Sequence, residues 1–154
     1  MSLRKAARGI SNFYDAMLAP AGVRATQYSI LAVLHQLGGA SINDLAARLD
    51  LDRTTTGKNM RPLAHAGLIE VVPSPTDGRS RVVQLTPQGA ATLAAARPLW
   101  QRAQLEFERA NGATFSRNLR RTLSALRVSP EPAGPSSARS QGRHSQDRPS
   151  QGRT

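Results

Sequence analysis

The chain has 154 residues and no cysteine, which excludes disulfide frameworks, thiolate zinc sites and cysteine-based redox sensing. Aromatic residues make up only 4% of the sequence, so its core must rest on leucine, alanine, valine and isoleucine. No segment approaches the roughly 18 consecutive apolar residues of a transmembrane helix, and the N-terminus lacks the apolar core of a secretory signal. We therefore expect a soluble cytoplasmic protein without membrane contact.

Side chains for catalysis or metal binding are also scarce. The histidines are His35, His65 and His144, and no pair of them has metal-ligand spacing. No serine or cysteine triad can be assembled around them, and Gly38-Gly39 lacks the glycine-rich pattern that cradles phosphate. We expect no metal, no cofactor and no enzymatic activity.

Acidic residues are few: ten Asp and Glu stand against 21 Lys and Arg, a net charge of +11. Such a surplus favours a polyanionic partner, above all nucleic acid, and the alternative is a solvated basic surface. Residues 128–154 are rich in Pro, Ser, Gly and Arg and have no large apolar residue after Val128, which predicts a disordered tail. The tail carries four arginines against two acids, so nine of the eleven net charges belong to residues 1–127.

Apolar spacing, capping residues and helix breakers predict a mostly helical (α+β) domain with one β-hairpin. Predicted N-caps are Thr26, Ser41, Asp52 and Thr86. The predicted helices span residues 3–18, 26–37, 41–49, 53–66, 87–110 and 115–127, and the strands span 68–72 and 81–85.

Three of these helices carry apolar rows that indicate packing against other helices. The rows are Leu3, Ala6, Ala7, Ile10, Phe13, Tyr14 and Met17 in the first helix, Leu93, Ala96, Trp100, Ala103, Phe107 and Ala110 in the fifth, and Leu119, Leu123 and Leu126 in the sixth. The seven-residue recurrence in the fifth helix predicts a seam with a partner helix. In the fourth helix we expect Thr56, Met60, Leu63 and Ala64 to point inward. We expect residues 3–19 and 87–127 to form an all-helical dimerisation region, and residues 26–86 to form a separate lobe.

The third and fourth predicted helices, joined by a short break, form a helix-turn-helix, and the following hairpin forms a wing. A recognition helix presents its N-terminal residues to base edges in the major groove. Here those residues hold hydroxyls, an amide and cations, which suit bases and phosphates. The candidate DNA contacts on this helix are Arg53, Thr54, Thr55, Lys58, Asn59 and Arg61. The alternative is an exposed polar helix face.

The predicted wing tip carries Asp77, Arg79 and Arg81. An arginine on a hairpin tip can enter a narrow minor groove, where the potential is most negative. We expect Asp77 to stabilise the wing by pairing with a nearby arginine.

Over residues 3–127 the sequence resembles the MarR family of bacterial transcriptional regulators. The resemblance rests on RATQYSILAVL, on SINDLAARLDLDRTTTGKNMRPLAHAGLI, on the wing element Asp77-Gly-Arg79 and on VVQLTPQGAATL. It implies a homodimer with one recognition helix per half-site, with base and phosphate contacts from Thr54, Thr55, Lys58, Asn59 and Arg61 and minor-groove insertion by Arg79. Position 56 is usually apolar and position 57 often polar in such proteins, whereas this chain has Thr56 and Gly57.

The resemblance also implies repression of a palindromic operator at the nucleoid, and a small aromatic or phenolic effector that releases the DNA. Candidate effector residues are Tyr14, Met17, Tyr28 and Trp100, although the same residue types form ordinary cores and dimer seams. The alternative function is a winged-helix module that binds RNA or acts as a protein adaptor, since one fold hosts several uses.

Overall fold

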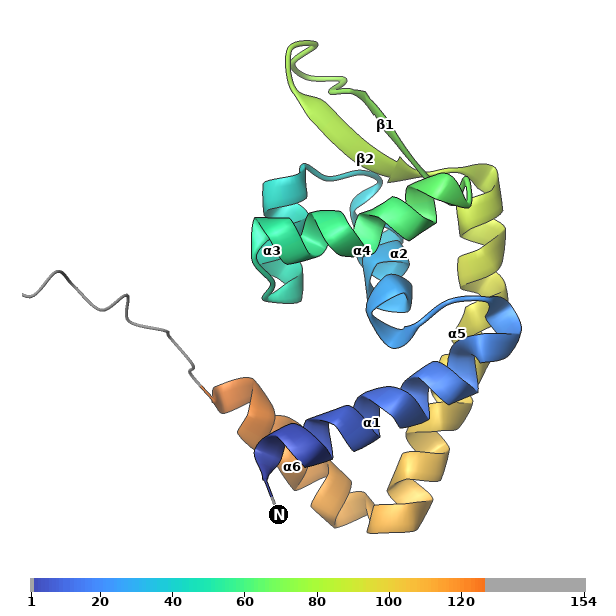
Figure 1. Ribbon diagram of the computed structural model, residues 1–154, viewed down its shortest axis with the longest axis vertical. Helices are drawn as coiled ribbons and strands as arrows, with labels where there is room; N and C mark the ends of the chain where they lie inside the picture. Colours follow the sequence, from blue (N-terminus) through green and yellow to red (C-terminus); the bar gives the residue numbers. More distant parts are fainter. Residues whose placement is uncertain (1, 127–154) are drawn as a thin grey trace, which may run out of the picture.

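The computed structural model describes residues 2–126 as a helical chain with one antiparallel hairpin (Figure 1). Its elements are α1 (Leu3–Leu18), the short 3-10 helix η1 (Ala19–Ala21), α2 (Ala25–Leu37), α3 (Ile42–Leu49), α4 (Arg53–His65), β1 (Ile69–Pro73), β2 (Arg81–Leu85), α5 (Pro87–Asn111) and α6 (Ala113–Ala125). The predicted mostly helical fold with a two-stranded wing is confirmed. The predicted tail over 128–154 and the predicted helix end at 127 lie outside the described residues.

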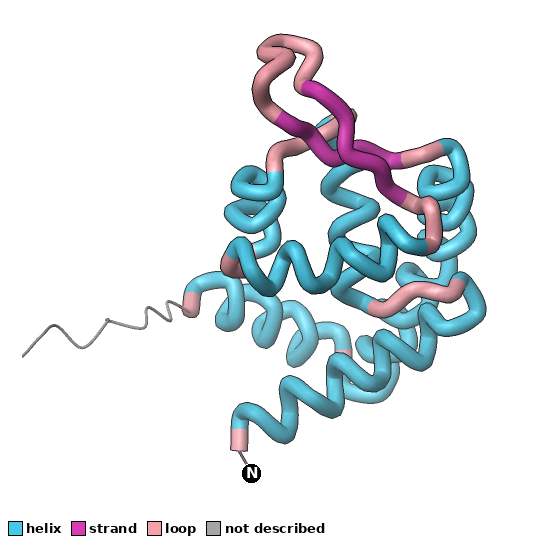
Figure 2. Tube along the Cα trace, turned by 45° about the horizontal axis from the view of Figure 1, so that its top comes forward, coloured by secondary structure: helices cyan, strands magenta, loops and turns pink. Residues whose placement is uncertain are grey.

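The elements form two parts joined by α5. Helices α2, α3 and α4 and the β1–β2 hairpin make up one part, which we call the reading lobe (Figure 1). Helix α5 begins beside this lobe, contacts α2, and continues to α1 and α6, which form the second part. The hairpin projects away from the helices of the lobe (Figure 2). A single long helix thus connects the lobe to the α1–α6 region.

Three of the four predicted N-caps are confirmed. The Ser41, Asp52 and Thr86 side chains accept hydrogen bonds from the backbone N–H groups of Asp44 (3.1 Å), Thr55 (2.8 Å) and Gly89 (3.0 Å). Each cap satisfies an N–H that has no partner within its own helix.

The fourth predicted cap, Thr26, is wrong, because α2 begins at Ala25 and Thr26 lies inside it. The Ala25 N–H donates to Asp15 Oδ1 of α1 at 2.8 Å, and the Arg24 N–H donates to Gln27 Oε1 at 2.9 Å. The carboxylate of Asp15, ten residues earlier in the chain, therefore accepts a backbone N–H of the first turn of α2. No local sequence pattern could indicate this contact.

The core lies mainly where α2, α3, α4 and the hairpin meet the first half of α5. Fully buried side chains include Ile30, Leu31, Leu34, Leu45, Leu63, Val83 and Leu93. Met60 and Thr56 of α4 are buried as predicted, but Ala64 is exposed, so its predicted inward position is wrong.

Much of the predicted seam on α5 packs against the chain's own elements. Leu93, Ala96 and Ala103 are buried by the chain's own elements. Trp100 and Phe107 are half-buried, and their rings meet tyrosines of α1 and α2. The seven-residue spacing therefore indicated helix packing correctly, with α1 and α2 as neighbours within the chain, and a seam with a second copy stays a prediction.

A close backbone approach fixes the hairpin to the start of α5. A Cβ added to Gly89 would overlap the carbonyl oxygen of Leu68, so only glycine fits there. The Thr86 N–H donates to the same Leu68 carbonyl at 3.1 Å, and its hydroxyl donates to the Gly67 carbonyl at 2.6 Å. These contacts set the position of the wing relative to α5.

The second part leaves an apolar face without a neighbour. The side chains of Leu3, Phe115, Leu123 and Leu126 are 69%, 54%, 46% and 51% exposed, and the predicted packing of Leu3, Leu123 and Leu126 against other helices stays a prediction for the dimer. Three of these, Leu3, Phe115 and Leu123, border a groove of about 700 Å³ between α1 and α6 together with Ala6, Ala7, Ile10, Phe107 and Leu119. We call this groove and its exposed apolar rim the α1–α6 face.

Candidate nucleic-acid interface

Helices α3 and α4 are held together by a tight turn and by the buried side of α4. The turn passes through Asp50, a non-glycine residue with a left-handed backbone (φ 54°), whose N–H bonds back to α3. Thr56 is fully buried, and its hydroxyl donates to the Asp52 carbonyl at 2.9 Å. A threonine replaces the usual apolar residue here without leaving a polar group unsatisfied, since its hydroxyl bonds within its own helix.

The N-cap of α4 is a fixed negative charge. Asp52 accepts hydrogen bonds from the Thr55 hydroxyl at 2.6 Å and from the Thr55 N–H at 2.8 Å. These bonds, that of the hydroxyl first, hold the pKa of the Asp52 carboxyl below its ordinary value. The carboxylate also opposes the partial positive charge of the helix N-terminus, which stabilises the first turn of α4.

The outward side of α4 brings four of the predicted contact residues together. Arg53, Thr54, Lys58 and Arg61 are exposed and border one shallow hollow with Ile42 of α3. The Arg53 guanidinium donates to Asn43 Oδ1 at 3.2 Å, so a residue of α3 positions this cation. Asn43 is not among the residues predicted from the sequence, because helical periodicity does not link two positions ten residues apart in different helices.

Two other predicted contact residues lie on a different side of α4 and bond to the helix itself. The Asn59 side chain donates to the Thr55 carbonyl at 2.9 Å, and Asn59 is half-buried. The Thr55 hydroxyl is the donor to the Asp52 cap. The structure therefore separates Thr55 and Asn59 from the cationic group, and their roles stay predictions.

The wing is a regular hairpin with a tip built around Asp77. The strands pair from Ile69 with Leu85 to Pro73 with Arg81. Asp77 Oδ1 accepts from the Arg79 N–H at 3.1 Å, and the Asp77 carbonyl accepts from the Ser80 N–H at 3.0 Å. Asp77 thus shapes the turn through the backbone.

The predicted ion pair of Asp77 with an arginine is not formed. Within residues 2–126 the ion pairs join Arg109 to Glu106 and Arg120 to Glu108, both outside the wing. Arg79 and Arg81 are exposed and keep their cationic groups available for a partner. The physical reason is the short turn, in which the carboxylate reaches the backbone N–H two residues ahead.

One of the four candidate effector residues, Trp100, contacts two of the others, Tyr14 and Tyr28. The Trp100 ring lies 4.8 Å from the Tyr28 ring with an interplanar angle of 19°, and 4.8 Å from the Tyr14 ring. Tyr14 also meets Phe13 and Phe107, with ring centroids 5.3 Å and 6.4 Å away. The rings of this cluster therefore pack against one another. Met17, also on α1, is half-buried.

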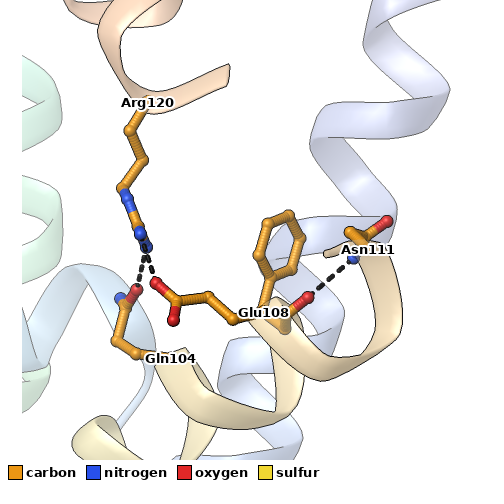
Figure 3. A network of polar contacts seen from close by, with 5 residues as sticks. Gln104, Glu108, Asn111 and Arg120 are labelled. Carbon is orange, nitrogen blue, oxygen red and sulfur yellow. Dashed lines mark hydrogen bonds and ion pairs between the residues drawn. The ribbon is translucent and has the colours of Figure 1, made fainter. Parts of the chain in front are cut away.

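A polar network lies beside this aromatic cluster and joins α5 to α6. The Arg120 guanidinium pairs with Glu108 and donates to Gln104 Oε1 at 2.9 Å (Figure 3). Burial raises the pKa of the Tyr14 phenol above its ordinary value; the charge of Arg120 opposes that rise and that of Glu108 adds to it. The phenol of Tyr14 therefore stays protonated beside this ion pair.

Within the described residues no group of three His, Asp or Glu side chains is placed to hold a metal ion. None of the helices between residues 2 and 126 is both long enough and apolar enough to traverse a bilayer.

A helix-turn-helix followed by a projecting hairpin, with cations along its second helix and on the hairpin tip, defines the chain as a winged helix-turn-helix protein. A family model described as the MarR family matches residues 23–80, from the start of α2 through the wing tip. The chain belongs to the MarR family of transcriptional regulators, which are not enzymes.

Individual relatives agree with this assignment. The transcriptional regulator MosR of M. tuberculosis, solved in complex with DNA, is 35% identical, with a TM-score of 0.70 over 80% of this chain and 88% of that one. The transcriptional repressor CouR, bound to a 23-mer DNA duplex, is 27% identical, with a TM-score of 0.71 over 80% and 87%.

The multiple antibiotic resistance protein MarR of Salmonella typhimurium is 34% identical over 74 residues, which are 48% of this chain and 51% of that protein. The matches to curated relatives thus span about half of those proteins or less, from 40% to 51% of their length.

Proposed function

We propose that the protein binds a palindromic operator in double-stranded DNA as a homodimer and represses transcription there. The observation that carries this proposal is the exposed group of Arg53, Lys58 and Arg61 on the second helix of a helix-turn-helix, next to a wing with Arg79. MosR, similar to this chain over four fifths of its length, was solved in complex with DNA.

The residues divide into phosphate and base contacts. Lys58 and Arg61 lie along α4 beyond its first turn, where cations can meet phosphates or guanine edges, and Thr54 reaches the floor of the major groove. Arg79 enters the neighbouring minor groove, and Arg81, at the tip end of β2, contacts the flanking phosphates. Thr55 and Asn59 complete the set: Asn59 keeps its amide oxygen and one N–H for a base after bonding to its own helix.

The α1–α6 face is proposed as the dimer interface, with a second copy of the chain as its occupant. Leu3 of α1 and Phe115 and Leu123 of α6 are exposed around one groove, and so much apolar surface in one place is rare on a protein face that stays in water. Residues 129–154 contain no large apolar side chain that could cover it. Residues 3–19 and 87–127 then serve dimerisation, and residues 26–86 serve DNA reading.

The experiment that tests this function is selection of bound duplexes from a random pool, followed by gel shifts at about 150 mM salt, where surface charges are screened as in the cell. We expect enrichment of an inverted repeat with half-sites about one helical turn apart. Duplex RNA of the same sequence should bind far more weakly, because its major groove is closed to side chains. Equal binding of RNA, or no enriched site, would favour the RNA-binding or adaptor alternative.

A small aromatic effector belongs to the same proposal. Tyr14, Tyr28 and Trp100 are its candidate site, and because the Trp100 ring contacts both tyrosine rings, a ligand must displace one of them to bind. Displacement would alter the link between α5 and α2, and with it the spacing of the two reading lobes. Trp100 is the only tryptophan, so its fluorescence reports binding of benzoate-type probes directly. Unchanged fluorescence at millimolar probe would remove the effector from the proposal.

A further inference from the structure

The outward side of α4 contains a hollow of about 290 Å³ with a glycine in its lining. The lining residues are Ile42, Arg53, Thr54, Gly57, Lys58 and Arg61. Gly57 lies inside a regular helix, and a Cβ added there would meet nothing within 4 Å. Glycine is disfavoured in a helix interior relative to alanine. The packing of the protein therefore gives no reason for a glycine at position 57.

The chemistry of the hollow differs between its rim and its floor. Three cations stand around it, and Asn43 fixes one of them, Arg53, at 3.2 Å. No acidic side chain lines it. Its remaining surface includes the half-buried Ile42 and the bare helix backbone at Gly57. An apolar floor inside a cationic rim suits a ligand that has a small apolar group between anionic neighbours.

In duplex DNA one group matches this description. The methyl group of thymine is the apolar group that base edges present in the major groove, and phosphates flank it on both strands. We propose that Gly57 determines specificity: the hollow receives the C5-methyl group of a thymine in each half-site while the rim cations hold the adjacent phosphates. This inference rests on the proposed function and names the base feature that α4 reads. A side chain at position 57 would occupy the space of the methyl group.

The test is a double-mutant cycle. It adds a methyl group to the protein at position 57 and removes a methyl group from the DNA by replacing thymine with uracil. Wild-type protein and Gly57→Ala are titrated against the selected duplex and against duplexes in which single thymines are replaced by uracil. For wild type we expect one thymine per half-site whose replacement weakens binding about fourfold, as for one lost buried methyl group. Gly57→Ala should bind the thymine duplex about tenfold more weakly, and uracil at that position should restore much of its binding, because the alanine methyl group then has the space to itself.

Two controls separate this effect from changes in folding. Gly57→Ala should melt at a temperature no lower than wild type, because alanine fits without a clash and favours the helix. Ala64→Ser, exposed on the same helix outside the hollow, should bind and respond to uracil as wild type does.

Two results would overturn the inference while leaving the proposed function intact. One is equal affinity of Gly57→Ala and wild type for the selected duplex. The other is an equal loss on every sequence together with a smaller salt dependence, which would mean that a phosphate occupies the hollow. If the wild-type protein enriches no site at all, the proposed function itself fails, and this is visible before any variant is made.

Discussion

The indole of Trp100 on α5 stacks on the ring of Tyr28 on α2, with centroids 4.8 Å apart and planes 19° from parallel. Trp100 also contacts Tyr14 of α1 at 4.8 Å, so one side chain touches both the reading lobe and the first helix. The two parts of the molecule are therefore joined by an aromatic contact as well as by the continuous backbone of α5.

Replacing Trp100 by alanine should lower the free energy of unfolding by about 2–4 kcal/mol, because it removes both ring contacts and leaves a cavity. Trp100→Phe should cost less, since it keeps one ring in place. Urea unfolding followed by circular dichroism measures both variants. Equal stability of Trp100→Ala and wild type would mean that these contacts add nothing to the fold.

Stability at acid pH should depend on Asp52. Since folding lowers the pKa of this carboxyl, its contribution is present above the ordinary pKa of 3.8 and is lost as the pH falls through the lower pKa of the folded state. The variant Asp52→Asn still has a side chain that caps the helix, but its amide does not titrate. Melting curves between about pH 2 and pH 7 should therefore show a smaller acid loss for Asp52→Asn than for wild type. Parallel curves would contradict the assignment.

Lys58→Ala and Arg61→Ala should each weaken DNA binding on all duplexes and reduce the salt dependence of the affinity by about one unit, the effect of one lost phosphate contact. The matched control is Arg97→Ala, an exposed cation on α5 far along the chain from the reading helix. Binding titrations at several salt concentrations measure the affinity of each variant and its salt dependence. A variant with an unchanged slope makes no phosphate contact.

Leu123→Asp should give a folded monomer, because Leu123 is 46% exposed on the α1–α6 face and supports no packing within the chain's own core. Leu93→Asp, in contrast, should unfold the protein, since Leu93 is 1% exposed in the core. Light scattering gives the mass and circular dichroism the folded fraction. A persistent dimer of Leu123→Asp would place the interface elsewhere.

Gly89→Ala should destabilise the protein by about 1–3 kcal/mol, as expected for overpacking, because its methyl group would overlap the Leu68 carbonyl. Gly57→Ala makes the same chemical change in open space and should stabilise by about 1 kcal/mol. Thermal unfolding of the two variants side by side measures this contrast. Shifts of the same sign would show that the backbone contact at Gly89 yields easily.

Short-range sequence patterns were sufficient to predict the helices and strands and several of the residues at which they begin. Ser41, Asp52 and Thr86 act within three residues of the amides that they cap, so their role depends on sequence spacing alone. The strand 81–85 and the reading helix from Arg53 follow from patterns of the same short range. The sequence by itself therefore determined the fold class and the cations of the reading helix.

Tertiary structure decided which surfaces those elements cover. Asp15 of α1 accepts the Ala25 N–H at the start of α2, and Asn43 positions Arg53. Tyrosines of α1 and α2 pack on Phe107 and Trp100 of the α5 row. Helical periodicity gives the side of a helix that is apolar but not the element that packs on it, because that choice depends on contacts between distant parts of the chain.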